Sequence, residues 1–264
     1  MFETNKTKIV ATLGPSSHSR EDILSLIDAG MDVTRINLSH GDRQSHAYYT
    51  ETVKYARDLA GKSTAILFDT RGPEIRVGEL GDGIKLEEGS VIKFGYHPDH
   101  KDVIPVNYSK LADDLKAKDI MLLDDGKMRM QVLNCSEGIV SAKVIVGGLL
   151  SSRKRVSLPD IEVNLPSITD QDEADIIFGV EQEVDFIAAS FVRTADDVMT
   201  VRAVIEKAGG NQAIIAKIEN RQGVDNLEEI LEVADGLMVA RGDLGVEMPA
   251  EEVPVIQKKV IREA

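Results

Sequence analysis

A lysine and a glutamate stand two residues apart at the carboxyl end of an apolar segment, QAIIAKIEN (212–220). Side chains in a β-strand alternate between its two faces, so Lys217 and Glu219 share one face with Ala213 and Ile215. The pair is either an ion pair at a fraying strand end, or a metal-ligating carboxylate beside a cation that neutralises a transferring group. The second interpretation places a reactive centre at the carboxyl end of the strand, where barrel enzymes gather their active sites.

A second acid follows the next expected strand. In GLMVARGDLG, Asp243 lies just past the strand end, between Gly242 and Gly245. A turn aspartate beside glycine is common, and this is one interpretation. The other is that Asp243 and Glu219, on neighbouring parallel strands, share Mg²⁺ or Mn²⁺. Mg²⁺ is typically held by one or two carboxylates together with waters and substrate oxygens.

Polar side chains also occupy one face of the segment VTRINLSH, among them Asn37 and Ser39, while Asp69 and Thr70 end the strand that follows. Such groups need partners, because burying them unpaired is costly. Their amide, hydroxyl, carboxylate and backbone oxygens suit a hard monovalent or divalent cation. A local hydrogen-bond network is the alternative interpretation.

Two arginines complete the set of candidates. Arg35 shares the polar face of VTRINLSH, and Arg76 follows the next strand. Either arginine is consistent with a surface ion pair. Beside an oxygen-rich cation site they would instead form a phosphate clamp, because the planar guanidinium binds phosphate through paired hydrogen bonds.

The hydrophobic pattern predicts strands that alternate with helices and position these residues. The strands are expected at 8–14, 33–40, 63–70, 184–192, 212–220 and 236–242. The helices are expected at 19–30, 44–61, 170–182, 195–209, 224–234 and 251–264. Capping-box-like pairs, Ser19 with Asp22 and Thr169 with Asp172, mark two helix starts.

Helical periodicity is missing for about 90 residues in the middle of the chain. Segments such as GDGIKLEEGSVIKFGY and MRMQVLNCSEGIVSAKVIVGG are short, β-branched and separated by glycines and charged turns. This pattern predicts an inserted antiparallel β domain.

The alternation on either side implies parallel β/α units with right-handed crossovers. We count roughly six units, whereas a (β/α)₈ barrel needs eight strands. An open doubly wound sheet fits the same pattern. The sequence has no G-x-G-x-x-G motif after a strand, which weakens a dinucleotide-binding version of that sheet.

Composition narrows the class of protein. A formal net charge of −14 and an aromatic content of 4% argue against nucleic-acid binding, which depends on neutralised phosphates and base stacking. No segment approaches the roughly 20 apolar residues of a membrane span, and the N-terminus lacks a signal-peptide pattern. The single cysteine, Cys135, suits a reducing compartment. We therefore expect a cytoplasmic protein that binds neither nucleic acid nor membranes.

Five motifs resemble those of pyruvate kinases in order and context: TKIVATLGPSS, MDVTRINLSHG, FDTRGPEIR, KIENRQGVDNLEEIL and MVARGDLGVEMP. The resemblance covers essentially the whole chain, and the last two motifs are highly specific. It implies an α/β fold, a (β/α)₈ TIM-type barrel interrupted after the third strand by a small β-barrel domain that acts as a lid. The expected domains are 1–72 and 166–264 for the two parts of the barrel, and 73–165 for the lid.

The resemblance also implies a reaction, the transfer of the phosphoryl group of phosphoenolpyruvate to ADP, giving pyruvate and ATP in glycolysis. Lys217 and Arg35 would be catalytic, with Lys217 stabilising charge on the phosphoryl group. Arg35 and Arg76 would contact phosphate. Glu219 and Asp243 would hold Mg²⁺ or Mn²⁺.

Further roles follow from the same resemblance. The backbone N–H groups around Gly242 and Asp243 would receive the substrate carboxylate, as anions bind at helix starts. K⁺ would be bound by Asn37, Ser39, Asp69 and Thr70. The residues expected near the nucleotide are Asn37, His40 and Lys154, and a plain hydrogen-bonding role is the alternative for His40.

The lid segment SSRKRVSLPD departs from the family pattern S-[RK]-K-G-V-N-L-P-G. Arg155, Ser157 and Asp160 stand in place of Gly, Asn and Gly. Lys154 still matches the lid lysine expected to reach the nucleotide phosphates, and Arg155 beside it bears on the geometry of that loop. The alternative interpretation of Arg153, Lys154 and Arg155 is a solvated run of charge.

The sequence lacks the family's seventh and eighth strands, including a T-Q-M segment implicated in protonating enolpyruvate, and its C-terminal regulatory domain. We therefore expect an incomplete barrel, and the tetramer typical of the intact family implies a homo-oligomer. One alternative is an inactive fragment that retains metal or ligand binding or an assembly role. Another is a different metal-dependent barrel enzyme acting on 2-oxo acids, such as an aldolase or lyase.

Overall fold

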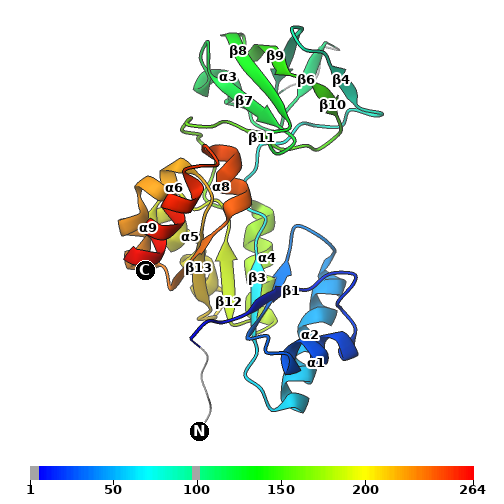
Figure 1. Ribbon diagram of the computed structural model, residues 1–264, viewed down its shortest axis with the longest axis vertical. Helices are drawn as coiled ribbons and strands as arrows, with labels where there is room; N and C mark the ends of the chain where they lie inside the picture. The colour runs from blue at the N-terminus through cyan, green and yellow to red at the C-terminus, as the bar shows by residue number, and fades with distance from the viewer. Residues whose placement is uncertain (1–5, 97–101) are drawn as a thin grey trace.

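The computed structural model describes residues 6–96 and 102–264. Residues 1–5 of the first expected domain and 97–101 of the second lie outside the described residues. A helix-covered parallel sheet forms one part of the molecule, and a unit made mostly of β-strands stands at one end of it (Figure 1). We call these two parts the half-barrel and the β unit.

The half-barrel contains a six-stranded parallel sheet in the order β1-β2-β3-β12-β13-β14. Its spatial order follows the chain order, so every crossover runs in the same direction and the sheet curls as a segment of a barrel. A doubly wound sheet reverses its strand order at a switch point, and this alternative is therefore wrong. The strands are β1 (Val10–Thr12), β2 (Val33–Asn37), β3 (Ala65–Asp69), β12 (Phe186–Ala189), β13 (Ala213–Ile218) and β14 (Gly236–Val239).

Helices cover the outer face of this sheet (Figure 1). As predicted, the Ser19 hydroxyl accepts the Asp22 N–H at 3.1 Å, and Thr169 and Asp172 form a reciprocal capping box. No helix in the described part of the chain has both the length and the apolar character needed to cross a membrane. The helices are α1 (Arg20–Asp28), α2 (Arg43–Ala60), α4 (Asp170–Glu181), α5 (Ala195–Lys207), α6 (Arg221–Asp225), α7 (Leu227–Val233), α8 (Arg241–Glu247) and α9 (Val253–Glu263).

Two boundaries near the carboxyl end differ from the prediction. The helix expected at 224–234 is divided into α6 and α7, because Asn226 leaves the helical conformation (φ −96°, ψ 20°) and donates its side-chain N–H to the Arg193 carbonyl at 2.9 Å. The strand expected to reach Gly242 ends at Val239, and α8 begins two residues later. Asp243 therefore belongs to the first helical turn of α8 and is not part of a loop.

The β unit lies between β3 and α4 in the chain and has its own buried apolar cluster, separate from that of the half-barrel. Its main sheet has the order β11-β7-β8-β9-β5-β6, and β10 pairs with β4. Two isolated antiparallel β-bridges link the edges of this sheet, one from Arg76 to Arg155 and one from Val77 to Val106. The elements are β4 (Ile84–Leu86), β5 (Val91–Gly95), β6 (Val103–Pro105), α3 (Leu111–Asp114), β7 (Ile120–Leu123), β8 (Met128–Ser136), β9 (Ile139–Val146), β10 (Gly148–Leu150) and β11 (Val156–Ser157).

The β unit leaves the half-barrel after β3 and returns before α4. β3 and β12 are nevertheless hydrogen-bonded neighbours, with Leu67 opposite Phe186 and Asp69 opposite Ala188. The parallel sheet is therefore continuous across the insertion, and side chains at the ends of β3 and β12 stay adjacent.

Arg193 anchors the returning segment. Its guanidinium donates to the carbonyls of Val163 (3.3 Å), Leu165 (2.9 Å) and Pro166 (3.3 Å). Asp197 of α5 holds the same guanidinium, with Oδ1 3.1 Å from Nη2. Burial acts to raise the pKa of Asp197, but hydrogen bonds and the charge of Arg193 outweigh it, and the net pKa is lowered from 3.8.

Asp197→Asn is expected to lower the free energy of unfolding by about 2 kcal/mol at neutral pH, the scale of a lost charged hydrogen bond. Because folding lowers the pKa of Asp197, its stabilisation is present above about pH 4 and is lost as the pH falls below that value. The difference between wild type and variant should therefore shrink in acid. Urea unfolding at several pH values measures it, and a difference independent of pH would contradict this account.

Candidate active site

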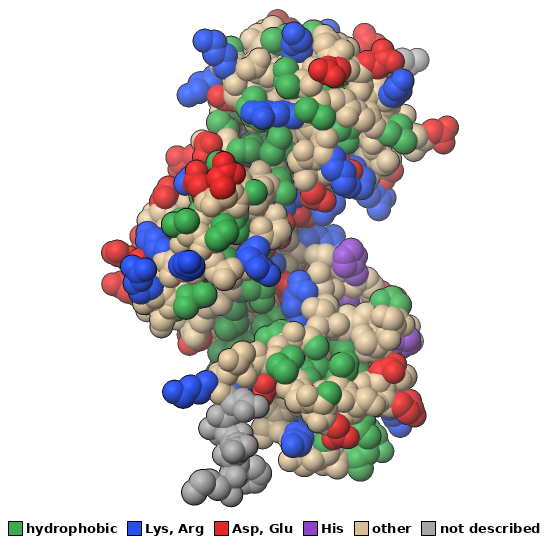
Figure 2. All heavy atoms as spheres, viewed as in Figure 1, with side chains coloured by type: hydrophobic (Ala, Val, Ile, Leu, Met, Phe, Trp, Pro, Cys, Tyr) green, Lys and Arg blue, Asp and Glu red, His purple; other side chains and the backbone are tan. Residues whose placement is uncertain are grey.

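The carboxyl ends of the half-barrel strands surround a cavity of about 430 Å³. Charged side chains gather around the hollow between the half-barrel and the β unit (Figure 2). Ten of the residues predicted from the sequence line this cavity: Arg35, Asn37, Ser39, His40, Asp69, Thr70, Arg76, Lys217, Glu219 and Asp243.

Lys217 is the centre of a buried charge network. Its ammonium group lies 3.0 Å from Asp69 Oδ1 and 3.0 Å from Glu219 Oε1, and it donates to the Ser190 hydroxyl at 2.7 Å. The side chains of Asp69 and Glu219 are each only 1% exposed. Lys217 and Glu219 do form an ion pair, but it is buried and does not lie at a fraying strand end.

Burial and charge act in opposite directions on this network. Burial acts to lower the pKa of Lys217, but the charges of Glu219 and Asp69 outweigh it, and the net pKa is raised. Burial raises the pKa of Glu219 to about 7 although Lys217 opposes the shift, and the nearby charge of Asp243 adds to it. Lys217 is therefore a fixed cation at neutral pH rather than a proton acceptor.

Phe191 contributes a backbone donor to the same network. Its N–H donates to Glu219 Oε2 at 2.7 Å. Phe191 has φ +57°, a left-handed conformation that is uncommon for a residue other than glycine. The strained backbone thus directs an N–H at a carboxylate that burial would otherwise leave poorly solvated.

Arg35 of β2 extends the network towards β1, the strand at one edge of the sheet. Its guanidinium contacts Asp69 Oδ2 through Nε at 2.7 Å and Nη2 at 2.5 Å, and it donates to the Thr12 hydroxyl at 2.9 Å. Asp69 therefore bridges Arg35 and Lys217, which places two cations on one side of the cavity. This arrangement suits an anionic ligand.

The predicted cation-binding oxygens come from the adjacent ends of β2 and β3. Asn37 Oδ1 accepts the Ser39 N–H at 2.9 Å, and the Thr70 hydroxyl donates to the Ala188 carbonyl at 3.2 Å. The Ser190 hydroxyl donates to the Thr70 carbonyl at 2.7 Å. Both features, an oxygen-lined corner and a local hydrogen-bond network, are present together.

Glu219 and Asp243 are the candidate ligands for a divalent cation. The described residues contain no group of three or more His, Cys, Asp or Glu side chains placed to hold a metal ion. Two carboxylates lining one cavity still fit Mg²⁺, which completes its shell with waters and substrate oxygens. One oxygen of Asp243 is already engaged, because Arg155 Nη1 lies 2.5 Å from Oδ1.

Two of the predicted site residues do not line the cavity. Lys154 forms an ion pair with Asp124 of the β unit at 2.8 Å, and neighbouring Arg153 lines the cavity instead. Gly242 lies in the first turn of α8 outside the cavity wall. Arg76 does line the cavity, but its guanidinium pairs with Glu74 and donates to the Arg153 carbonyl at 2.8 Å.

Several lining residues were missed by the sequence analysis: Arg71, Glu74, Arg153, Ser190 and Phe191. Ser190 and Phe191 directly follow β12, as Thr70 follows β3. The rule that barrel sites gather at strand ends would have indicated them. Glu74 and Arg153 carry no such signal, because they enter the cavity from the β unit.

Residues 4–264 match the family model described as the pyruvate kinase barrel domain. The chain belongs to the pyruvate kinase family. It is 48% identical over 263 residues to the pyruvate kinase of Geobacillus stearothermophilus, covering 97% of this chain and 45% of that protein. It is 46% identical over 263 residues to the enzyme of Staphylococcus haemolyticus, covering 97% and 45%, respectively.

The chain thus spans about half the length of the curated pyruvate kinases it matches. The pyruvate kinase of Staphylococcus aureus shows the same relation, with 45% identity over 98% of this chain and 45% of that protein. The match to the barrel-domain model agrees with the curled parallel sheet of the half-barrel.

The buried charge network generates a stability prediction. Lys217→Met would leave Asp69 and Glu219 without their shared cation, and we expect a loss of about 3–5 kcal/mol in the free energy of unfolding. The loss should be smaller at about pH 6 than at about pH 8, because the raised pKa of Glu219 lets it accept a proton in the folded state.

Urea unfolding of the wild type and of Lys217→Met at the two pH values measures this loss of stability. Lys207→Met is the matched control, because the Lys207 side chain is 83% exposed and its removal should change stability by less than about 0.5 kcal/mol. Equal losses for the two variants would contradict the buried network.

Proposed function

We propose that this chain supplies the substrate and metal sites of a pyruvate kinase, a phosphotransferase that converts phosphoenolpyruvate and ADP into pyruvate and ATP in glycolysis. The observation that carries the proposal is the buried Lys217 between Asp69 and Glu219, at the carboxyl ends of the barrel strands. Phosphoryl transfer depends mainly on positioning and charge stabilisation, and this cavity supplies both.

Lys217 would stabilise the transferring phosphoryl group. Its pKa is raised by the Glu219 and Asp69 carboxylates against the effect of burial, so it keeps its proton and acts as a cation. Its three N–H donors contact Ser190, Asp69 and Glu219, so a hydrogen bond to a phosphoryl oxygen would replace one of these contacts. Arg35, fixed by Asp69, would bind phosphate oxygens together with Arg76.

Glu219 and Asp243 would hold Mg²⁺ or Mn²⁺. When bound, the cation would neutralise charge on the phosphate oxygens and on the enolate oxygen of the product. The backbone N–H groups of Gly242 and Asp243, in the first turn of α8, would receive the substrate carboxylate. The phosphorus–oxygen bond of phosphoenolpyruvate breaks as ADP attacks, and the resulting enolpyruvate takes a proton at carbon.

The corner formed by Asn37, Ser39, Asp69 and Thr70 would hold K⁺, with Asn37 and His40 also near the nucleotide. The β unit, residues 73–165, would close over the cavity as a lid between barrel parts 1–72 and 166–264. Lys154 would reach the nucleotide phosphates only if it left Asp124, its present partner at 2.8 Å. We further propose a cytoplasmic homo-oligomer that binds neither nucleic acid nor membranes.

Lys217→Ala in the full-length protein should lower the rate of pyruvate formation from phosphoenolpyruvate and ADP by at least about 10³-fold, because it removes the buried charge that faces the phosphoryl group. A coupled assay with Mg²⁺ and K⁺ measures this rate, and Lys207→Ala should leave it unchanged. Unaltered turnover in Lys217→Ala would disprove the assignment. Turnover of oxaloacetate without phosphoenolpyruvate would favour a lyase instead.

Asn37→Ala should raise the K⁺ concentration that gives half-maximal activity by about tenfold, because an oxygen ligand is removed. The maximal rate at saturating K⁺ should change less. Titration with K⁺ at fixed substrate and Mg²⁺ concentrations measures both quantities. An unchanged K⁺ dependence would place the monovalent cation elsewhere.

A further inference from the structure

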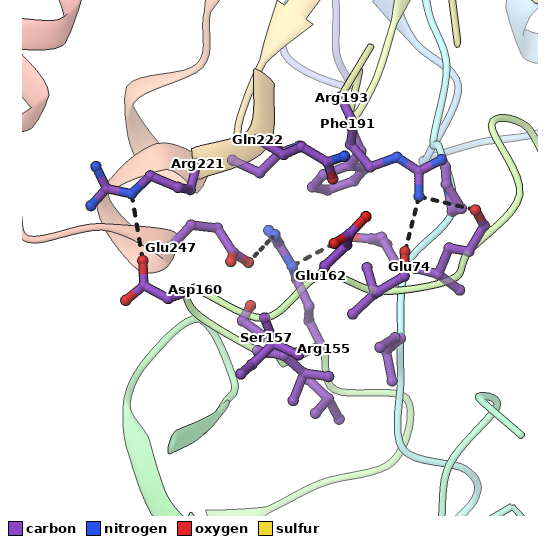
Figure 3. Close-up of a pocket in the computed structure, with 18 of the residues that line it drawn as sticks. Glu74, Arg155, Ser157, Asp160, Glu162, Phe191, Arg193, Arg221, Gln222 and Glu247 are labelled. Carbon is purple, nitrogen blue, oxygen red and sulfur yellow. Dashed lines mark hydrogen bonds and ion pairs between the residues drawn. The ribbon is translucent and has the colours of Figure 1, made fainter. Parts of the chain in front are cut away.

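Arg155 is a cation from the β unit that is buried against the half-barrel. It precedes β11, is 8% exposed, and lies with its guanidinium 4.7 Å from the centre of the Phe191 ring. Nη1 is 2.5 Å from Asp243 Oδ1, and Nη2 is 3.3 Å from Glu247 Oε1, both in α8. Figure 3 shows the guanidinium reaching up between Glu247 and Glu74, across the wall of a second cavity of about 470 Å³.

The charges around Arg155 explain why it stays in this position. Burial acts to lower its pKa, but the carboxylates of Glu247, Asp243 and Glu74 outweigh that effect, and the net pKa is raised. Glu247 is itself largely buried, and burial raises its pKa in spite of Arg155. Three carboxylates would repel one another here without an internal cation.

One of these three carboxylates also belongs to the candidate divalent-cation site. Asp243 lines the smaller cavity with Glu219, and its charge contributes to the raised pKa of Glu219. A divalent cation bound to Asp243 would face the Arg155 guanidinium at close range, in a poorly screened setting where like charges repel strongly. Arg155 and the metal therefore cannot both bind Asp243 well.

We propose that Arg155 is an internal competitor of the divalent cation: it occupies Asp243 while the β unit is docked on α8, and metal binding at Glu219 and Asp243 displaces it. This inference rests on the metal site of the proposed function. The displacement couples metal binding to the docking of the β unit. When Arg155 loses its contacts with Asp243 and Glu247, the ion pairs that hold the β unit against α8 are lost as well. Divalent cations thereby loosen the β unit.

Mn²⁺ binding to the full-length protein without substrates tests the competition, with free Mn²⁺ measured from its electron paramagnetic resonance signal. Arg155→Gln should lower the Kd for Mn²⁺ about tenfold, since the metal no longer has to break a charged hydrogen bond. Arg155→Lys keeps the charge but loses the paired donors, so its affinity for Mn²⁺ should rise by a smaller factor. It replaces Arg155→Gln in the test if that variant does not fold. Arg129→Gln, an exposed arginine of β8, is the matched control with an unchanged Kd.

Glu219→Gln separates failure of the competition from failure of the metal site. A Kd that Glu219→Gln leaves unchanged, or no Mn²⁺ binding in any variant, overturns the metal site and the competition with it. Weaker binding in Glu219→Gln combined with an equal or higher Kd in Arg155→Gln overturns the competition alone.

The coupling to the β unit has a separate readout. Spin labels on Lys143→Cys in β9 and Lys258→Cys in α9, in a Cys135→Ser background, report the separation of the β unit from the half-barrel. Mg²⁺ should broaden the distance distribution in otherwise wild-type protein, whereas Arg155→Gln should show the broad distribution without Mg²⁺. A distribution that neither Mg²⁺ nor Arg155→Gln alters would overturn the coupling.

Discussion

The arrangement of Lys217 between two buried carboxylates is the constraint on which the rest of the site depends. Asp69 and Glu219 are almost fully buried, and Lys217, Arg35 and the Phe191 N–H offset the cost of burying these carboxylates. The partners come from neighbouring strands, β2, β3, β12 and β13. Only a continuous, curled parallel sheet brings those strand ends to the same place, so the charge network and the half-barrel require each other.

The insertion after β3 is compatible with that requirement because the chain returns beside the strand it left. β12 pairs with β3 in regular parallel register, and Arg193 ties the returning segment to α5 through three backbone carbonyls. The β unit can therefore carry its own core without disturbing the sheet. It also contributes side chains to the site from outside the barrel, and Glu74, Arg153 and Arg155 all reach the cavities in this way.

Because of these side chains, the charge in each of the two cavities influences the other cavity. Glu74 and Phe191 line both of them, and Arg155 links Asp243 on one side with Glu247 on the other. A cation placed in the smaller cavity therefore changes the charges that hold the β unit. If Asp243 holds a divalent cation as proposed, the docking of the β unit and the affinity for that cation depend on the same carboxylate.

The sequence by itself determined the alternation of strands and helices, the break in that alternation, and the set of polar residues at strand ends. These features follow from local rules, since side-chain alternation placed Lys217 and Glu219 on one face and capping residues marked the starts of α1 and α4. The tertiary structure decided what local rules cannot reach. Strand order excluded the doubly wound sheet, Lys154 pairs with Asp124 and does not line the cavity, and Arg155 reaches Asp243. Each of these outcomes depends on contacts between residues far apart in the chain, which periodicity and spacing do not encode.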